Sequence, residues 1–459
     1  MILSLPAKWL ALLLCMPMFL LPASCSSSPD DDDPAAGGLE ITLEARNRTQ
    51  EVRRIQVARG GVFNEPSWYP ADKKGWTFAG WFLDEEATQP YTFGQPVDHS
   101  FTLYAGWSRD LILTDRGKLA RVTGASLSGE GLPNPNRTDA NWNLGGTDLG
   151  IIWEIADGKY GVLFGDSYGS DFRPSGGGPG AASDWRSNVL AFSENTDLDM
   201  GLKFSSMLTD GHNANRAVAI IERPNYYAFT PIPTAAIALN GVQYMHYMYW
   251  EVGQTARADE NYSSLYRSTD NGLHWESCRG KVEFGCDSYF AMVAYAKRPG
   301  DPYCYMVGSQ SGRGYRNSVA KLARFTYDNI LNQSSYEYWN GNKMTWVKGN
   351  ENEATTVLNG TIGEMSVVWL ERYGRWLALY FSQENYAICY RTAARINGPW
   401  SEERVLVSGW DSRYAQLYGS YVHPLSTKPD SETIYYTLSQ WQPYNVFWMK
   451  ANVSLAPEY

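Results

Sequence analysis

The chain has 459 residues, of which 44% are hydrophobic and 14% aromatic, with 18 Trp, 31 Tyr and 42 Gly. This length allows two or three domains with a large buried core, and the aromatic and glycine content favours strands and tight turns over helices. The formal net charge of −10 argues against a basic surface for nucleic acid, so a neutral polymer is the better partner.

The first 25 residues have the pattern of an export signal. Lys8 precedes an apolar run over residues 9–21 that is too short to span a membrane, and Ala23 and Ser24 stand directly before Cys25. This order resembles the lipobox of bacterial lipoproteins, in which the cysteine becomes an acylated N-terminus. We therefore expect lipidation at Cys25 and an exported, outer-membrane protein of a Gram-negative bacterium. A simple secretory signal is the alternative.

An acidic tether and a small module follow the signal. Residues 26–38 contain four consecutive aspartates and no large apolar side chain, so they predict a solvated linker. Residues 39–107 predict alternating strands, including 39–43 and 101–105. The sequences at 75–82 and 103–107 resemble the internalin-B-type repeat, a β-grasp-like module, which implies a spacer or adhesive role. Its tryptophans are expected in its core: Trp76, Trp81 and Trp107.

From residue 108 to 459 the pattern is short strands broken by Gly, Asn, Asp and Pro, which predicts an all-β domain. Ser268 to Trp275 matches the Asp-box of sialidase-like propellers, where the motif shapes a hairpin turn and has no catalytic part. Five blades of four strands fit the length of this region, although six or seven also remain open. The predicted fold class is therefore an all-β, five-bladed β-propeller after a small β-grasp-like domain.

Two apolar strands over 149–155 and 159–164 flank an Asp-Gly pair, which is a strong hairpin signal. With a three-residue loop, the register places Asp148 directly opposite Asp166, and opposed Cβ atoms lie about 5 Å apart. A two-residue turn would shift this register by one. Paired carboxylates tend to separate their pKa values, as an acid and its partner need for glycosidic bond cleavage. The alternative is that both bond backbone amides at strand ends.

Further motifs lie at 185–192, 363–366 and 418–424. Together with Gly-Thr-Asp at 146–148 and Phe-Gly-Asp at 164–166 they resemble glycoside hydrolase family 183, formerly the domain of unknown function numbered 4185. The resemblance implies a five-bladed propeller with endo-D-arabinanase activity on the α-D-arabinofuranosyl linkages of mycobacterial arabinogalactan and lipoarabinomannan. It also implies that Asp148 and Asp166 are the catalytic pair. Which of them is the acid stays open, as do retention or inversion and D- or L-arabinan.

Other polar and aromatic residues are weaker candidates for the same site. Glu364 is a possible third carboxylate, with a salt-bridged strand residue as the alternative. A lone histidine is more often structural, and any single aromatic is explained equally well by packing between blades. The candidates for sugar binding are Trp142, Asn143, Arg186, Asn188, His246, Tyr421 and His423.

Two other functions compete with the arabinan hydrolase: a sialidase-like exo-glycosidase and a non-catalytic glycan-binding propeller. A sialidase needs an arginine triad, and the Arg-Ile-Pro or Arg-Leu-Pro motif that opens it does not occur near the start of the propeller region. No metal or cofactor is expected, and the protein is expected to be a monomer. Cys278 and Cys286 are either a disulfide or free thiols, and spacing alone does not decide between them.

Overall fold

The computed structural model describes residues 38–71, 73–173, 183–222, 229–251, 261–310 and 318–458. The predicted export signal with Cys25 and nearly all of the acidic tether lie outside these residues. Within the described ranges no helix is long and apolar enough to cross a membrane. Apart from α1 (Thr138–Asn141) and short 3₁₀ turns, the regular elements of the described chain are strands, so the all-β prediction is confirmed.

The N-terminal module is a four-stranded sheet with the order β2 (Val52–Val57), β1 (Leu39–Glu44), β6 (Phe101–Arg109) and β4 (Trp76–Phe82). The predicted strands at 39–43 and 101–105 are confirmed as β1 and β6, which pair in parallel. The same module also contains a two-stranded sheet of β3 (Val62–Phe63) and β5 (Gln95–Pro96). Trp81 is in the core as predicted, whereas Trp76 and Trp107 are half-buried.

Five further sheets follow in the described residues. The first contains β8 (Leu149–Ala156), β9 (Lys159–Phe164), β10 (Val189–Ser193) and β11 (Ser206–Met207). The second contains β12 (Phe229–Leu239), β13 (Val242–Glu251), β14 (Tyr262–Ser268), β15 (Glu276–Ser277) and β16 (Glu283–Gly285). The third contains β17 (Met292–Ala296), β18 (Tyr303–Ser309), β19 (Ala320–Thr326), β20 (Glu337–Asn340), β21 (Thr345–Lys348) and β22 (Thr356–Leu358).

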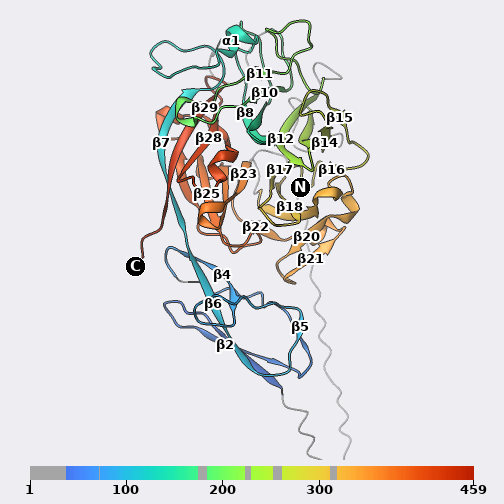
Figure 1. The fold of residues 1–459 in the computed structure, drawn as a ribbon, viewed down its shortest axis with the longest axis vertical. Helices are drawn as coiled ribbons and strands as arrows, with labels where there is room; N and C mark the ends of the chain where they lie inside the picture. The colour runs from blue at the N-terminus through green and yellow to red at the C-terminus, as the bar shows by residue number, and fades with distance from the viewer. Residues whose placement is uncertain are drawn as a thin grey trace, which may run out of the picture.

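The fourth sheet contains β23 (Ile362–Leu370), β24 (Arg375–Ser382), β25 (Ala387–Ala393) and β26 (Arg404–Ser408). The fifth contains β27 (Leu417–Val422), β28 (Thr433–Gln440), β29 (Asn445–Leu455) and β7 (Leu111–Arg121). The first strands of the five sheets lie against one another in the cyclic order β8, β12, β17, β23, β27 and back to β8. In Figure 1 these sheets follow one another above the N-terminal module. Apolar clusters fill the spaces between neighbouring sheets.

The cycle is closed by the strand that follows the N-terminal module and the last strand of the described chain. β7 pairs antiparallel with β29, so an early strand completes the last sheet. Asp110 is the single residue between β6 and β7, and it is buried. Its backbone N–H donates to Gly75 O over 2.8 Å and its carbonyl accepts from Ala456 N over 2.8 Å. These hydrogen bonds hold the module directly against the closed sheet, and Arg395 adds a 2.5 Å ion pair with Glu65 of the module.

Strand direction gives the cycle two distinct ends. Each of the five sheets begins with two antiparallel strands, so the first strand starts at the same end at which the second strand finishes. Asp148 precedes β8 and Asp166 follows β9, which places both at this end. We call it the carboxylate face. The hairpin turns between first and second strands, such as Asp157-Gly158, lie at the opposite end.

The Asp-box forms the turn after β14, as predicted. Ser268 Oγ accepts the N–H of Gly272 over 2.9 Å, and Asp270 Oδ1 accepts the N–H of His274 over 2.9 Å. Asn271 and Gly272 take φ values of 59° and 91°, which the turn requires. The motif acts only on the fold. Cys278 is a buried free thiol, so the alternative of a disulfide with Cys286 is not realised.

Candidate active site

The hairpin β8–β9 places Asp148 through two irregularities. Ala156 pairs with Lys159, so the turn has two residues and the predicted three-residue loop is wrong. A bulge between Glu154 and Ala156 then restores the predicted register from Ile151 onward, and a second bulge at Gly150 shifts it again. Gly165 N consequently donates to Asp148 O over 3.3 Å. The predicted direct pairing of Asp148 with Asp166 is therefore wrong by one residue.

The carboxylate of Asp148 lies directly over Gly165. A Cβ atom built on Gly165 would stand 2.3 Å from Asp148 Oδ1, so only glycine leaves room for the acid there. The side chain is 3% exposed, and the Tyr418 hydroxyl donates to Oδ2 over 3.1 Å. Tyr418 begins the fifth sheet, so the acid is held between the two sheets that meet across β8 and β27.

Asp166 occupies a more open position. Its side chain is partly exposed, and Oδ1 accepts hydrogen bonds from Trp185 Nε1 at 2.9 Å and Thr230 Oγ1 at 2.8 Å. Thr230 belongs to β12 of the second sheet. One acid is thus buried and the other is open to solvent, which is the kind of difference that separates the roles of two carboxylates.

Tyr444 connects the two acids. It is 1% exposed, and burial first, with the nearby carboxylates of Asp148 and Asp166 adding to it, raises the pKa of Tyr444 well above its usual range. Tyr444 O also accepts the N–H of Thr147 over 2.9 Å. The Tyr444 ring lies 5.9 Å from that of Tyr168, which stacks on Trp185, the donor to Asp166. It also lies 5.7 Å from the ring of Trp441, which packs on Tyr418, the donor to Asp148. One aromatic cluster therefore connects the two acids despite the shifted register.

Bulges recur in the strands around this site. Besides β8, the innermost strands β12, β23 and β27 shift register between Pro233 and Ala235, between Ile362 and Met365, and between Tyr418 and Ser420. A bulge turns side chains away from simple alternation and is common beside active sites. Glu364 lies within the bulge of β23 and is 5% exposed. It is thus on the inner strand of the fourth sheet, two sheets away from β8.

Arg186 and Asn143 hold the loop around Asp184, and the burial of Arg186 argues against its predicted role in sugar binding, whereas Asn143 is half-buried. Arg186 is 4% exposed and donates from Nη1 to Ala217 O over 2.7 Å and from Nη2 to Asn143 O over 2.6 Å. Burial lowers the pKa of this guanidinium to about 10. The Asn143 amide donates to Asp184 Oδ2 over 2.6 Å and accepts from Ser170 N over 2.8 Å.

Asn188 is also structural, contrary to its predicted role. It is fully buried, and its Oδ1 accepts the N–H groups of Ile220 and Ile221 at 2.9 and 3.1 Å. Its Nδ2 donates to Pro231 O over 3.1 Å. Because backbone groups occupy both ends of the amide, it ties the first sheet to the entry of the second.

The two candidate histidines are packing residues. His246 Nδ1 contacts Tyr295 Oη at 3.0 Å between the second and third sheets. His423 lies 4.5 Å from the ring of Tyr160, and its Nδ1 accepts from Leu425 N over 3.2 Å. Both are fully buried, and burial lowers the pKa of each to about 3. The prediction that they bind sugar is wrong because neither reaches solvent.

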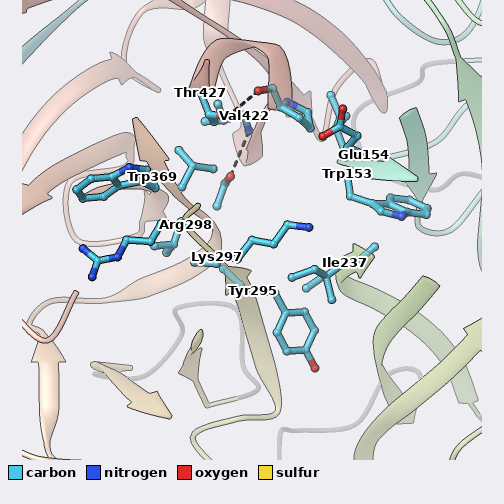
Figure 2. Close-up of a pocket in the computed structure, with 18 of the residues that line it drawn as sticks. Trp153, Glu154, Ile237, Tyr295, Lys297, Arg298, Trp369, Val422 and Thr427 are labelled. Carbon is cyan, nitrogen blue, oxygen red and sulfur yellow. Dashed lines mark hydrogen bonds between the residues drawn. The ribbon is translucent and has the colours of Figure 1, made fainter. Parts of the chain in front are cut away.

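Trp142 is half-buried and packs against the apolar cluster of the first and fifth sheets, 6.3 Å from the ring of Phe204. Tyr421 lines a cavity of about 470 Å³ that runs between the inner strands toward the turn end of the cycle. Figure 2 shows this cavity with residues contributed by different sheets: Trp153, Glu154, Ile237, Tyr295, Lys297, Arg298, Trp369, Val422 and Thr427. Asp148 and Asp166 are not among its lining residues.

Three residues that hydrogen-bond the acids are not among the predicted site residues: Thr230, Trp185 and Tyr418. A signal existed for Tyr418, because Gly419, with φ 52°, marks the bulge that turns this side chain toward Asp148. The residue predicted from the same motif is Tyr421 instead. For Thr230 and Trp185 the contacts depend on how sheets and loops meet in space, which spacing does not encode.

Comparisons with known proteins identify two regions. Residues 133–450 match the family described as Domain of unknown function (DUF4185), and residues 40–106 match the Listeria-Bacteroides repeat domain. "Notoamide biosynthesis cluster protein J" of Aspergillus sp. (strain MF297-2) is 28% identical over 316 residues, which is 65% of this chain and 80% of that protein. "Notoamide biosynthesis cluster protein J'" of Aspergillus versicolor is 26% identical over 317 residues, or 65% and 82%.

Among solved structures, a candidate hydrolase from Bacteroides ovatus ATCC 8483 has a TM-score of 0.49 at 12% identity, covering 68% of this chain and 86% of that one. A GH43_1 enzyme from Xanthomonas citri has a TM-score of 0.41 at 11% identity, covering 68% and 91%. These likenesses are too distant to carry an argument about the chemistry of the site.

Proposed function

The chain belongs to the DUF4185 family, and we propose from its site that it is an endo-acting glycoside hydrolase built on a five-bladed β-propeller. The observation that carries the proposal is the pair of aspartates on the carboxylate face, one buried and one partly exposed, connected through the aromatic cluster around Tyr444. In the reaction, one aspartic acid protonates the leaving glycosidic oxygen while the other carboxylate acts as base or nucleophile.

The substrate we propose is D-arabinan, cleaved at α-D-arabinofuranosyl linkages. Support comes from the Gly-Thr-Asp and Phe-Gly-Asp motifs, whose resemblance to glycoside hydrolase family 183 falls on the two acids. The surroundings suit a neutral sugar chain, because the partly exposed ring of Trp185 lies beside Asp166, and it packs on the buried rings of Tyr168, Phe172 and Tyr444. Aromatic faces pack well against the apolar faces of sugar rings.

We further propose that residues 39–107 are an internalin-B-type spacer and that residues 108–459 are the catalytic domain. Lipidation at Cys25 and an outer-membrane location belong to the same proposal. Labelling cells that express the protein with an alkyne fatty acid tests the anchor, with Cys25→Ser as the comparison. Incorporation into the parent alone supports the anchor, and equal absence from both contradicts it.

Asp148→Asn and Asp166→Asn test the catalytic role. Each change keeps the size of the side chain and removes its acid chemistry, so the release of oligosaccharides from mycobacterial arabinogalactan should fall by between about 100-fold and 10,000-fold. Asp157→Asn is the matched control, because Asp157 is exposed at the other end of the same hairpin. Its rate should equal that of the parent.

The same samples separate an enzyme from a glycan-binding protein. If the parent retards arabinogalactan in affinity electrophoresis without releasing oligosaccharides, the protein binds the glycan and does not cleave it. If either Asn variant keeps parental turnover while folded, the assignment of the acids is wrong.

A further inference from the structure

Trp410 is the most exposed large hydrophobic side chain of the described residues, at 81%. It follows β26, which runs antiparallel to β25 and so ends where β25 begins. Gly409 N donates to Tyr386 O over 2.8 Å, and Tyr386 lies in the turn from β24 to β25 on the carboxylate face. Trp410 therefore stands on the same face as the two aspartates.

A continuous series of contacts leads from Trp410 to Asp148. The ring of Trp410 lies 5.1 Å from that of Tyr386, whose hydroxyl accepts the N–H of Gln416 over 2.6 Å. Gln416 O accepts the N–H of Trp441 over 2.9 Å. The Trp441 ring, 41% exposed, lies 6.2 Å from that of Tyr418, which hydrogen-bonds Asp148.

The series continues past the acids. Trp441 packs edge-on against Tyr444 at 5.7 Å, Tyr444 lies 5.9 Å from Tyr168, and Tyr168 stacks on Trp185 at 5.9 Å. Trp185 donates to Asp166. We call the row from Trp410 to Trp185 the aromatic row. It leads from the fourth sheet to the first and passes both acids. Its exposed or partly exposed rings are Trp410, Tyr386, Trp441 and Trp185, whereas Tyr418, Tyr444 and Tyr168 are buried.

The surroundings of Trp410 favour a sugar chain over a protein partner. The residues next to Trp410 and Tyr386 in the chain are polar and exposed, including Glu384, Asn385, Ser412 and Arg413, and among the described residues of this turn and of β26 the other exposed large hydrophobic side chain is Val405. Protein interfaces bury a contiguous apolar centre, whereas a lone exposed ring among hydrogen-bonding groups suits a ligand that is apolar on one face and polar at its edges.

We propose that Trp410 forms a distal subsite for a long polysaccharide, with Tyr386 supporting it and Trp441 nearer the acids. This inference rests on the proposed hydrolase function and deepens it. A chain bound across the aromatic row contacts Trp410 only if it extends well beyond the scissile bond. The subsite therefore selects long chains and contributes nothing to the chemistry of cleavage.

The test compares the full-length parent with Trp410→Ala, Trp410→Phe and Val405→Ala on soluble mycobacterial arabinogalactan and on short arabinofuranosyl oligosaccharides. Trp410→Ala should raise the KM for the polymer by about twofold to tenfold, the value of one aromatic contact, and leave kcat unchanged. Its kinetics on short oligosaccharides should match the parent. Trp410→Phe should recover most of the loss. Val405→Ala, on the outer strand β26 that Trp410 follows and 52% exposed, is the control and should have no effect.

Each outcome decides a different question. If the parent cleaves the polymer and Trp410→Ala has an unchanged KM, the subsite is overturned while the hydrolase stands. If the parent binds the polymer without cleaving it and Trp410→Ala weakens that binding, the subsite stands and the hydrolase fails. If the parent neither binds nor cleaves the polymer, the subsite and the hydrolase both fail. If Trp410 proves to be required for binding a protein partner, the subsite fails.

Discussion

Gly165 shows how one missing side chain arranges the site. The carboxylate of Asp148 occupies the space where a Cβ atom on Gly165 would stand, and the Tyr418 hydroxyl fixes its other oxygen. Asp166 directly follows Gly165 in the chain. The position of the Asp148 carboxylate relative to Asp166 therefore depends on residue 165 having no side chain.

Gly165→Ala should lower the rate of cleavage by on the order of 100-fold, because the added methyl displaces the Asp148 carboxylate by about 1 Å. Gly285→Ala is the matched control. Neither glycine has a left-handed φ, and a Cβ on Gly285 meets nothing within 4 Å, so it should retain the parental rate. Melting curves of both variants check that they fold, and an unchanged rate in folded Gly165→Ala would refute this role.

At the scale of the element, the bulge at the start of β8 decides where Asp148 points. Leu149 and Gly150 both take left-handed backbone angles, with φ 69° and 88°. A large residue such as leucine is rare there and carries a conformational cost, of a kind that is often found at functional sites. The tightly packed strand on the neighbouring sheet holds the bulge in place.

Gly150→Ala should destabilise the fold by about 1–3 kcal/mol more than Gly241→Ala does. Gly150 and Gly241 have similar positive φ values, 88° and 80°, so an alanine causes similar backbone strain at both positions. A Cβ at Gly150 also meets Thr437 Cγ2 and Val446 Cγ1 at 3.0 Å, whereas at Gly241 it meets nothing within 4 Å. Urea unfolding measures the difference, and equal losses would show that packing at the bulge does not matter.

The hairpin β8–β9 also shows which structural features could be predicted from the sequence alone. Its two strands and its Asp-Gly turn followed from local chemistry, and the middle of its register was predicted correctly at Ile151 and Leu163. The bulge at Gly150 was not predicted, because it depends on contacts with Thr437 and Val446 from another sheet. The histidines failed for the same reason: polarity suggested a cleft, and only the packing of whole sheets shows that they are sealed.

At the scale of the molecule, the buried His246 and His423 make the stability of the cycle of sheets depend on pH. His246 lies between the second and third sheets and His423 between the fifth and first. Burial lowers the pKa of both to about 3, below the value of about 6.5 expected in the unfolded chain. Between those values the unfolded chain binds more protons, so stability falls as the pH falls through this window.

At pH 5 each buried histidine should therefore cost about 2 kcal/mol of stability relative to pH 7.5. His423→Asn keeps an acceptor for Leu425 N and removes the titrating ring. Its unfolding free energy should fall less steeply between pH 7.5 and 5 than that of the parent, although it starts lower. Gly150→Ala, which also lowers stability but removes no titrating group, is the control and should keep the parental slope. Parallel slopes for His423→Asn and the parent would contradict the assignment.

The pairing of β7 with β29 has a mechanical consequence. β7 continues from the N-terminal module through the single residue Asp110, and it is joined to the last strand by an antiparallel ladder along most of its length. Tension between a polymer gripped on the carboxylate face and the module at the other end would run along the axis of β7. The hydrogen bonds of the β7–β29 ladder would then be loaded together in shear and not broken one at a time. The strand β7, which closes the cycle, is therefore also suited to resist a pulling force.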